Sequence, residues 1–471
     1  MSREVISIKR KALRINLEGS IYGTFAEIGA GQEVARTFFQ VGGASGTVAK
    51  TMSAYDMAFS DSIYGEEESG RYVSESRFNK MLTHEYELLG ERLVGDEYEG
   101  KRFFAYANTC SILNYTKTND PHCWMGLRFQ LTPGGGYNDV IVHIRLKDND
   151  ALLQQRVIGG VGVNLIFACF WYSNDINAFI DSLMDNLSVD QIEIDLVRIN
   201  GENFDIDNRL VALKLVKKGY TDATIFGSKR EVYQPKDFLY KKNVLCLRSR
   251  FRPYTLLSED MQKSGELTFQ HRLADDEQFI SLSELTLNNL MGDEDHDPTD
   301  FLDRAELLCQ LGHTVLVSNC DKHDKLIDFF TRCKTKKIGI IVGVMNLIEL
   351  FKKENYYNAP SELLSYFGGI FRGETVMIAY PYYSKSEQKV VDSTTLRVDD
   401  SLSHIYHHLI SNNLIVDSEN SHPDLLNIFS DKIIASIQAG DDTWKAAVPE
   451  KVAELITEKH LFGYKKELIE H

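Results

Sequence analysis

The sequence predicts a protein of mixed α+β and α/β class, and three patterns support this prediction. Two segments of alternating apolar and polar residues, 126–131 and 139–146, flank the turn TPGGGYN, which is typical of a β-hairpin. An alternating strand pattern over 191–199 is followed by a helical pattern over 207–219. Further on, the apolar strands TVLVSN and KKIGIIVGV bracket a helical segment, which predicts a Rossmann-like βαβ region with a parallel sheet.

The domain organisation follows from length and charge. A chain of 471 residues is long for one hydrophobic core, and its 43% apolar content is sufficient for more than one. No proline-rich or serine-rich linker interrupts the chain, so the acidic segment 276–300 is the predicted linker. We therefore predict an N-terminal α+β region over 1–275, with a subdomain break near residue 150, and a C-terminal α/β region over 301–471.

Composition also limits the classes of partner. The net charge of -16 disfavours binding to nucleic acid or to an anionic membrane. The N-terminus lacks the apolar core of a secretory signal, and the longest apolar stretch, 161–172, is too short for a membrane span. Seven cysteines without a CxxC pair indicate reduced, buried thiols. We expect a cytoplasmic protein with no transmembrane segment and no nucleic-acid partner, and a buried helix or strand at 161–172.

The first candidate site is the glycine-rich segment EIGAGQEVARTFFQVGGASGTVAKTMSAYD, residues 27–56. Its strand, glycine turn and helix pattern would direct backbone N–H groups and a helix N-terminus at an anion. The known fingerprints are incomplete, because Glu33 stands where a third glycine is expected and no Walker A lysine follows a glycine. The turns therefore face either a ligand or a neighbouring helix. The candidate ligand-binding residues are Gly29, Gly31, Gln32, Gly42, Gly43, Thr47, Lys50, Ser53 and Asp56.

A second candidate site is the basic segment LYKKNVLCLRSRFRPYT, residues 239–255. A basic cluster in an acidic protein can concentrate a phosphorylated ligand. The alternative is a solvated strand edge, or a surface that pairs with acidic residues. The predicted ligand-binding residues here are Lys241, Lys242, Arg250 and Arg252.

No metal site is predicted. The segment HIYHH, residues 404–408, has histidines at helical spacing but no further ligand that sequence can place, so a surface helix is favoured. The recognisable hydrolase, metalloprotease and kinase signatures are absent. The catalytic residues and the cofactor, if there are any, stay unknown at this point.

Five segments together resemble an uncharacterised bacterial cytoplasmic family over nearly the whole chain: YGTFAEIGAGQEVARTFF, GGASGTVAKTMSAYDM, IDNR, LYKK and FRP. Members of that family are labelled inconsistently, either as nicotinate or nicotinamide mononucleotide adenylyltransferase or as TonB-dependent receptor. The receptor label implies export, which the N-terminus does not favour. The adenylyltransferase label implies nucleotidyl transfer, although the HxGH-type motif of that class does not occur in this sequence.

Two functions are consistent with these patterns. The first is binding of a phosphorylated nucleotide-like small molecule, with nucleotidyl or phosphoryl transfer in nicotinamide-nucleotide metabolism as the reaction that the resemblance implies. The second is a non-catalytic, homo-oligomeric assembly or scaffold protein. Because many metabolic enzymes are symmetric oligomers, a homo-oligomer is expected in either case.

Overall fold

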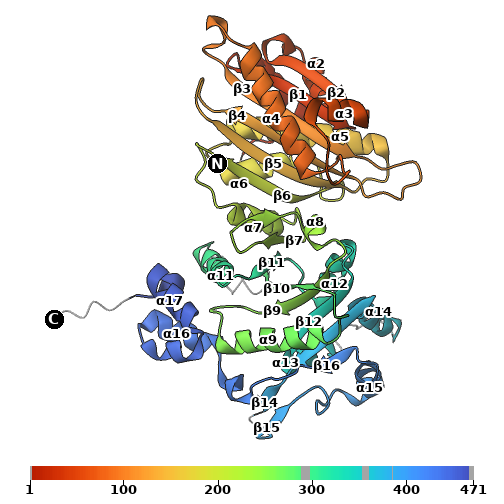
Figure 1. Ribbon diagram of the computed structural model, residues 1–471, viewed down its shortest axis with the longest axis vertical. Coiled ribbons are helices and arrows are strands. Elements are labelled where there is room, and N and C mark those ends of the chain that lie inside the picture. The colour runs from red at the N-terminus through yellow and green to blue at the C-terminus, as the bar shows by residue number, and fades with distance from the viewer. Residues whose placement is uncertain (1–2, 288–297, 353–359, 385, 466–471) are drawn as a thin grey trace, which may run out of the picture. The chain divides into compact units, whose positions relative to one another are not determined.

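The computed structural model describes residues 3–287, 298–352, 360–384 and 386–465 (Figure 1). The chain forms two compact units, which we call unit 1 (Met1–Thr221) and unit 2 (Asp222–His471). Each unit has one large β-sheet and its own helices. The predicted class is confirmed, since a mixed sheet with a hairpin is followed by a Rossmann-like region.

The unit boundary differs from the predicted one. Within the segment 276–300 that was expected to be a linker, strand β10 (Phe279–Thr286) pairs with strands on both of its sides in the sheet of unit 2. Residues 288–297 of that segment lie outside the described residues. Of the acidic residues in this segment, Asp276 and Glu277 lie in the short connection between α9 (Leu256–Gln270) and β10, which is inside unit 2 and is not a domain border. The contact boundary lies between Thr221 and Asp222.

The sheet of unit 1 has the strand order β2-β1-β3-β4-β5-β6. The strands β2, β1 and β3 are parallel, whereas β3, β4, β5 and β6 form antiparallel pairs, with the predicted hairpin as β4 and β5. The bounds are β1 (Ile21–Gly29), β2 (Val48–Ala54), β3 (Arg102–Ser111), β4 (His122–Gln130), β5 (Tyr137–Leu146) and β6 (Ile192–Gly201).

Helices cover both faces of this sheet. Gly162 in α5 approaches Tyr106 of β3, whereas Gly126 of β4 approaches Phe78 in α4, so these two helices pack on opposite faces. Helix α2 packs against α5, on the face that holds the main hydrophobic core. The bounds are α1 (Ile8–Leu17), α2 (Glu33–Gln40), α3 (Met57–Tyr64), α4 (Glu75–Arg92), α5 (Ala151–Trp171), α6 (Ile176–Leu183) and α7 (Asn208–Lys217).

Helix α5 contains residues 161–171 of the apolar stretch 161–172, and the prediction of a buried element there is confirmed for most of its residues. Among the described residues, it is the one helix that is long and apolar enough to cross a membrane by length and composition alone. Within the apolar window, 78% of the residues are buried inside the protein. A core helix of a globular unit accounts for this pattern.

The sheet of unit 2 has the order β16-β13-β12-β9-β10-β11-β7-β8. Its six strands from β16 to β11 are parallel, and β7 and β8 extend one edge in antiparallel fashion. Numbered along the chain, the parallel strands have the 3-2-1-4-5-6 order of doubly wound folds. The bounds are β7 (Ala223–Phe226), β8 (Val232–Tyr233), β9 (Asn243–Arg248), β11 (Thr314–Ser318), β12 (Lys337–Gly343), β13 (Glu374–Tyr380) and β16 (Ile415–Asp417), with a separate hairpin of β14 (Tyr382–Ser384) and β15 (Lys389–Val391).

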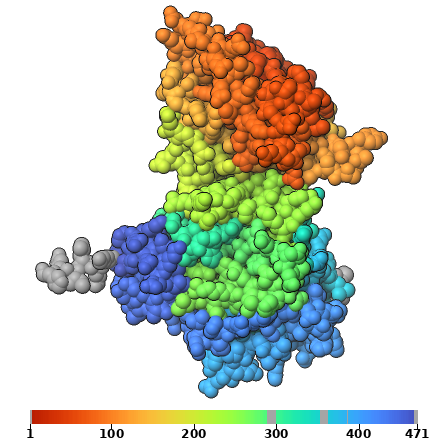
Figure 2. Space-filling model, viewed as in Figure 1, coloured from red at the N-terminus to blue at the C-terminus, as the bar shows by residue number. Residues whose placement is uncertain are grey.

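Helix α9 packs on one face of this sheet, where Gly265 of α9 lies close to Ile341 and Gly339 of β12 lies close to Phe269 of α9. Helices α12 to α15 contribute side chains to the core on the other face. Near the end of the chain, α16 and α17 gather in a lobe, coloured dark blue in Figure 2, and α17 contacts α11. The bounds are α8 (Pro235–Leu239), α9 (Leu256–Gln270), α11 (Pro298–Gln310), α12 (His323–Arg332), α13 (Val344–Leu350), α14 (Pro360–Ile370), α15 (Ser403–Ser411), α16 (Ser430–Ala439) and α17 (Glu450–Lys459).

Candidate functional site

A pocket of about 500 Å³ lies in unit 1, at the carboxyl ends of the parallel strands β1, β2 and β3. The chain passes from β1 to β2 through α2 on one face of the sheet. It then passes from β2 to β3 through α3 and α4, and α4 packs on the other face. Such a reversal beside β1 is a topological switch point, where α/β proteins place their ligands. We call this cavity the switch-point pocket.

The pocket lining combines hydroxyl, amide and apolar groups with one carboxylate. Its residues are Ile28, Gly29, Ala30, Gln32, Tyr55, Asp56, Met57, Ser60, Tyr72, Val73, Cys110, Ser111, Ile112, Leu113, Asn114 and Gln155. Among these residues there is no lysine, arginine or histidine. The lining therefore suits a polar molecule with an apolar or aromatic part better than a group of high negative charge.

The first glycine turn of the candidate segment is part of this pocket. Gly29 has a φ of 81°, and a Cβ there would lie 2.1 Å from the carbonyl oxygen of Cys110 on β3. A Cβ at Gly31 would lie 2.0 Å from Oδ1 of Asn108, also on β3. Both glycines are thus required because the turn lies directly against the neighbouring strand. Of the two, Gly29 also lines the pocket.

Three other predicted residues lie at the same edge of the sheet. The side-chain amide of Gln32 donates to the carbonyl of Gly29 and, at 2.8 Å, to Oγ of Ser53. Asp56 accepts from the backbone N–H of Phe59 at 2.9 Å, and so caps the N-terminus of α3. These bonds join the end of β1 to the end of β2, with Gln32 and Asp56 in the pocket lining.

The remaining predicted residues of the glycine segment lie elsewhere in unit 1. Gly42 and Gly43 have positive φ angles in the turn after α2, where Asn16 donates to the carbonyl of Gly42 at 2.7 Å. Thr47 precedes β2 and is buried. Lys50 forms an ion pair of 2.5 Å with Glu85 of α4. The structure therefore does not bring these four residues into the pocket lining.

The predicted basic residues belong to unit 2 and lie at both ends of strand β9. Lys241 and Lys242 precede this strand of six residues, and Arg250 and Arg252 follow it. Six residues of strand span roughly 20 Å, so the four side chains do not form one cluster. Arg252 pairs with Asp300 at 2.6 Å, and Arg250 lies 3.5 Å from Asp431. The sequence left open the alternative that the basic residues pair with acidic surface. Arg250 and Arg252 do so.

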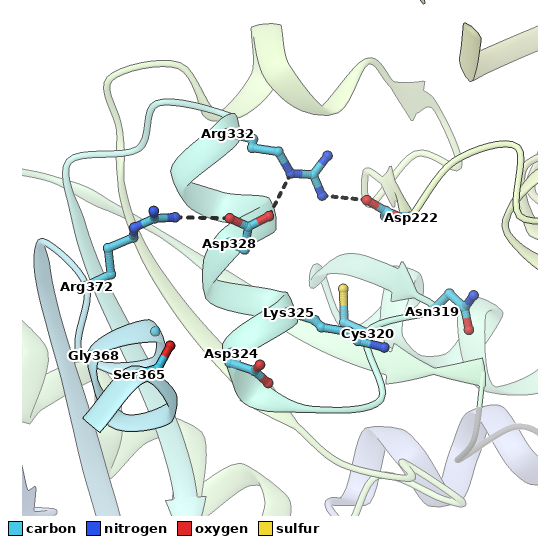
Figure 3. A pocket seen from close by; sticks show the side chains of 11 residues that line it. Asp222, Asn319, Cys320, Asp324, Lys325, Asp328, Arg332, Ser365, Gly368 and Arg372 are labelled. Carbon is cyan, nitrogen blue, oxygen red and sulfur yellow. Dashed lines mark hydrogen bonds and ion pairs between the residues drawn. The ribbon is translucent and has the colours of Figure 1, made fainter. Parts of the chain in front are cut away.

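A larger pocket of about 730 Å³ lies in unit 2, between α12, α14 and the segment after β11 (Figure 3). Its charges are balanced internally. Arg332 lies between two carboxylates, 2.5 Å from Asp222 and 3.0 Å from Asp328, and Arg372 donates to Asp328 at 3.0 Å. An anion would have to compete with these carboxylates for the guanidinium groups. None of the residues predicted from the sequence lines this pocket.

The cysteine prediction is wrong for one pair. Cys110 of β3 and Cys123 of β4 face each other in the antiparallel ladder and form a disulfide. Strand pairing brings together residues 13 positions apart, which spacing along the chain alone does not indicate. The other five cysteines are buried and form no disulfide, as expected. Cytoplasmic location stays a prediction.

Several lining residues were missed by reasoning from the sequence. Tyr72, Ser111 and Gln155 come from three separate segments that meet only when the sheet forms. For Ser111, the one signal in the sequence is its position at the end of an apolar strand, because the carboxyl end of that strand can lie beside that of β1. In the described part of the chain, no group of three or more His, Cys, Asp or Glu side chains is arranged to hold a metal ion.

Unit 1 is thus an α/β unit with a pocket at a switch point, and unit 2 has a doubly wound sheet. No protein-family model and no curated protein matches the chain. Similar solved structures are the competence/damage-inducible protein CihA from Agrobacterium tumefaciens, at 16% identity, and a CinA-superfamily protein from Enterobacter cloacae, at 10% identity. Each similarity covers 36% of this chain and 98% of the other, with a TM-score of 0.26. Similarity at this level supports no conclusion about activity.

Proposed function

We propose that unit 1 binds a nucleoside-like or nucleotide-like small molecule in the switch-point pocket. The observation that supports this most is the position of the pocket at the carboxyl ends of three parallel strands, where the chain reverses its direction of winding. The turn that the sequence singled out, with Gly29 and Gln32, forms part of its wall. Binding, and not a particular reaction, is what this geometry supports.

The lining favours the sugar and base of such a ligand over its phosphate. Asp56 and the hydroxyls of Ser60 and Ser111 suit ribose hydroxyl groups, and Tyr55 and Tyr72 offer aromatic surfaces for a planar base. Phosphate binding would call for cations, which this lining lacks. Nucleotidyl or phosphoryl transfer, with nicotinamide nucleotides as substrates, therefore stays a prediction that rests on the sequence resemblance.

Ligand-dependent stabilisation tests the proposal. Adenosine, nicotinamide riboside and their 5′-monophosphates would each be added during thermal melts, and any that raise Tm would be measured by calorimetry. Replacement of Tyr55 by Ala should weaken binding by roughly 1–3 kcal/mol, the usual contribution of one base stacked on an aromatic ring. Tyr55 is 82% exposed, so this change should not unfold the protein.

A matched control is Tyr115→Ala, because Tyr115 is also exposed in unit 1 but does not line the pocket. The control should bind as the wild type does. If none of the four compounds shifts Tm, the proposal is refuted. Equal losses in both tyrosine variants would instead show that binding occurs outside the pocket.

Self-association is the second candidate function, and one observation favours it. Tyr55, Met57 and Phe59 are 82%, 60% and 58% exposed, a dense group of large apolar side chains just before and at the start of α3. Such groups are common at contacts between proteins. The expected homo-oligomer would be seen by light scattering, and Phe59→Ser should reduce its size. A wild-type monomer at micromolar concentration would argue against this role.

A further inference from the structure

A chain of three ionisable side chains crosses three strands of unit 1. Nδ1 of His143 on β5 lies 2.5 Å from a carboxylate oxygen of Asp195 on β6. Nε2 of the same ring lies 3.0 Å from Nδ1 of His122 on β4. Asp195 and His143 are buried, so both side chains are shielded from bulk water. We call these three residues the His122 relay.

Hydrogen-bond direction follows from the carboxylate at one end. An ionised carboxylate only accepts, so Nδ1 of His143 carries a hydrogen and donates it to Asp195. In a neutral imidazole the other nitrogen is an acceptor, so Nε2 of His143 accepts from Nδ1–H of His122. Nε2 of His122 is then left with a free electron pair. The chain thus selects one tautomer at its outer end.

This outer nitrogen has no partner. In the described part of the chain, Nε2 of His122 makes no hydrogen bond, and His122 is partly buried. Ser111 lies directly opposite His122 in the β3–β4 ladder, and Ser111 lines the switch-point pocket. Opposed residues in such a ladder have Cβ atoms roughly 5 Å apart. His122 is therefore the direct neighbour, on the adjacent strand, of a residue that lines the pocket.

Burial, with the neighbouring positive charges, keeps the ring of His122 neutral. Burial, followed by the charges of His143, Arg145 and Arg71, lowers the pKa of His122 to about 3, against the opposing effect of Asp195. Burial and the charge of Asp195 raise the pKa of Glu193, which accepts a hydrogen bond from Thr221 at 2.7 Å. An added proton is consequently unfavourable on His122 itself, and the bond of His143 to Asp195 is the point in the chain where a carboxylate faces an imidazole.

We propose that the His122 relay accepts a proton from a hydroxyl group or a water molecule at the switch-point pocket. The O–H bond breaks, its electron pair and the negative charge stay on the oxygen, and the electron pair of Nε2 of His122 forms the new N–H bond. At the same time, Nδ1 of His122 releases its hydrogen to Nε2 of His143, so the positive charge comes to rest on His143 beside Asp195. This inference rests on the proposed ligand site and gives that site general-base chemistry, directed at a polar O–H group.

Diethyl pyrocarbonate tests the relay without a known ligand, because it acylates the free electron pair of a neutral imidazole. Peptide mass spectrometry should find His122 modified at neutral pH. Asp195→Asn should reverse the chain, because an amide can donate to Nδ1 of His143, which moves a hydrogen onto Nε2 of His122. The rate of modification should then fall at least roughly tenfold, as expected when a wrong tautomer is imposed.

Asp139→Asn is the matched control, since Asp139 lies on β5 but pairs with Arg128. Its rate should equal that of the wild type. Because Asp195→Asn could also unfold the protein, nitrogen-15 NMR of the wild type provides a second measurement, and it should show hydrogen on Nδ1 and none on Nε2 of His122. Hydrogen on Nε2, or an unchanged rate in a folded Asp195→Asn protein, would overturn the proposal.

The two proposals can fail separately. If none of the four compounds raises Tm but the tautomer and the rates are as expected, the ligand proposal fails and the relay stands as a proton acceptor without an assigned substrate. If one of the compounds binds in the pocket but does not slow modification of His122, the relay does not serve that pocket. That result would overturn the general-base role.

Discussion

Glu27 is predicted to make unit 1 less stable as the pH rises. It lies on β1 between Ser53 of β2 and Asn108 of β3, and it is 3% exposed. One of its carboxylate oxygens is buried without a hydrogen-bond partner, and the group accepts from the backbone N–H of Ala35. Burial, together with the nearby charge of Glu33, raises the pKa of Glu27 from 4.5 to about 8.

The sign of the effect follows from proton binding. Between pH 4.5 and about 8, the folded protein holds a proton on Glu27 that the unfolded chain has released. The stabilisation from protonated Glu27 is therefore complete below pH 4.5 and is lost as the pH rises through about 8. Integrated from pH 5 to pH 9, the loss is about 4 kcal/mol. For a unit of this size, that lowers Tm by on the order of 10 °C.

Thermal melts of the wild type and of Glu27→Gln across this pH range measure the effect. The variant carries a neutral isostere of protonated Glu27, so the fall in Tm with pH should be about 10 °C smaller than in the wild type. Glu33→Gln is the control, because Glu33 pairs with Arg36 and contributes only a like charge. If Glu27→Gln and the wild type show parallel pH dependence, Glu27 is ionised without cost and the reasoning is refuted.

Two further predictions concern packing and a buried ion pair. Gly31→Ala should lower the free energy of unfolding in urea by about 1–3 kcal/mol, because the added methyl group overlaps the side chain of Asn108. Gly42→Ala should lower it by about 1 kcal/mol from backbone strain alone, because no atom lies near the added methyl group. Equal losses in the two variants would contradict this difference in surroundings. Arg248→Leu should lower the free energy of unfolding by about 3–5 kcal/mol. In the wild type, Nε of Arg248 lies 2.8 Å from the fully buried carboxylate of Glu284, which this change leaves without its cation. A loss below about 1 kcal/mol would contradict this reasoning.

Local patterns were sufficient to predict individual elements. The alternation of 126–131 and 139–146 predicted β4 and β5, and the cap and stop residues of 207–219 predicted α7, since hydrophobic period and capping act within a few residues. Strand order was not predicted in this way. The strands β11 and β12 flank α12 along the chain, yet β10 and β9 lie between them in the sheet. That order depends on packing among distant segments.

The candidate site shows the same limit at the level of single residues. The sequence singled out Gly29 and Gln32 because a glycine turn after a strand is a local pattern. It offered no reason to join them to Ser111, which lies at the end of a different strand. Parallel pairing of β1 with β3 makes Gly29 the direct partner of Cys110, next to Ser111. Residues far apart in the sequence therefore form one wall.

The converse holds for the basic residues, which are close in sequence but separated by the strand between them. Lys242 precedes β9 and Arg250 follows it, so the extended backbone places them at opposite ends of this strand. A charge cluster that contains a strand is thus a poor predictor of a binding site. Residues at the carboxyl ends of several parallel strands are a better one, because the sheet itself brings those ends together.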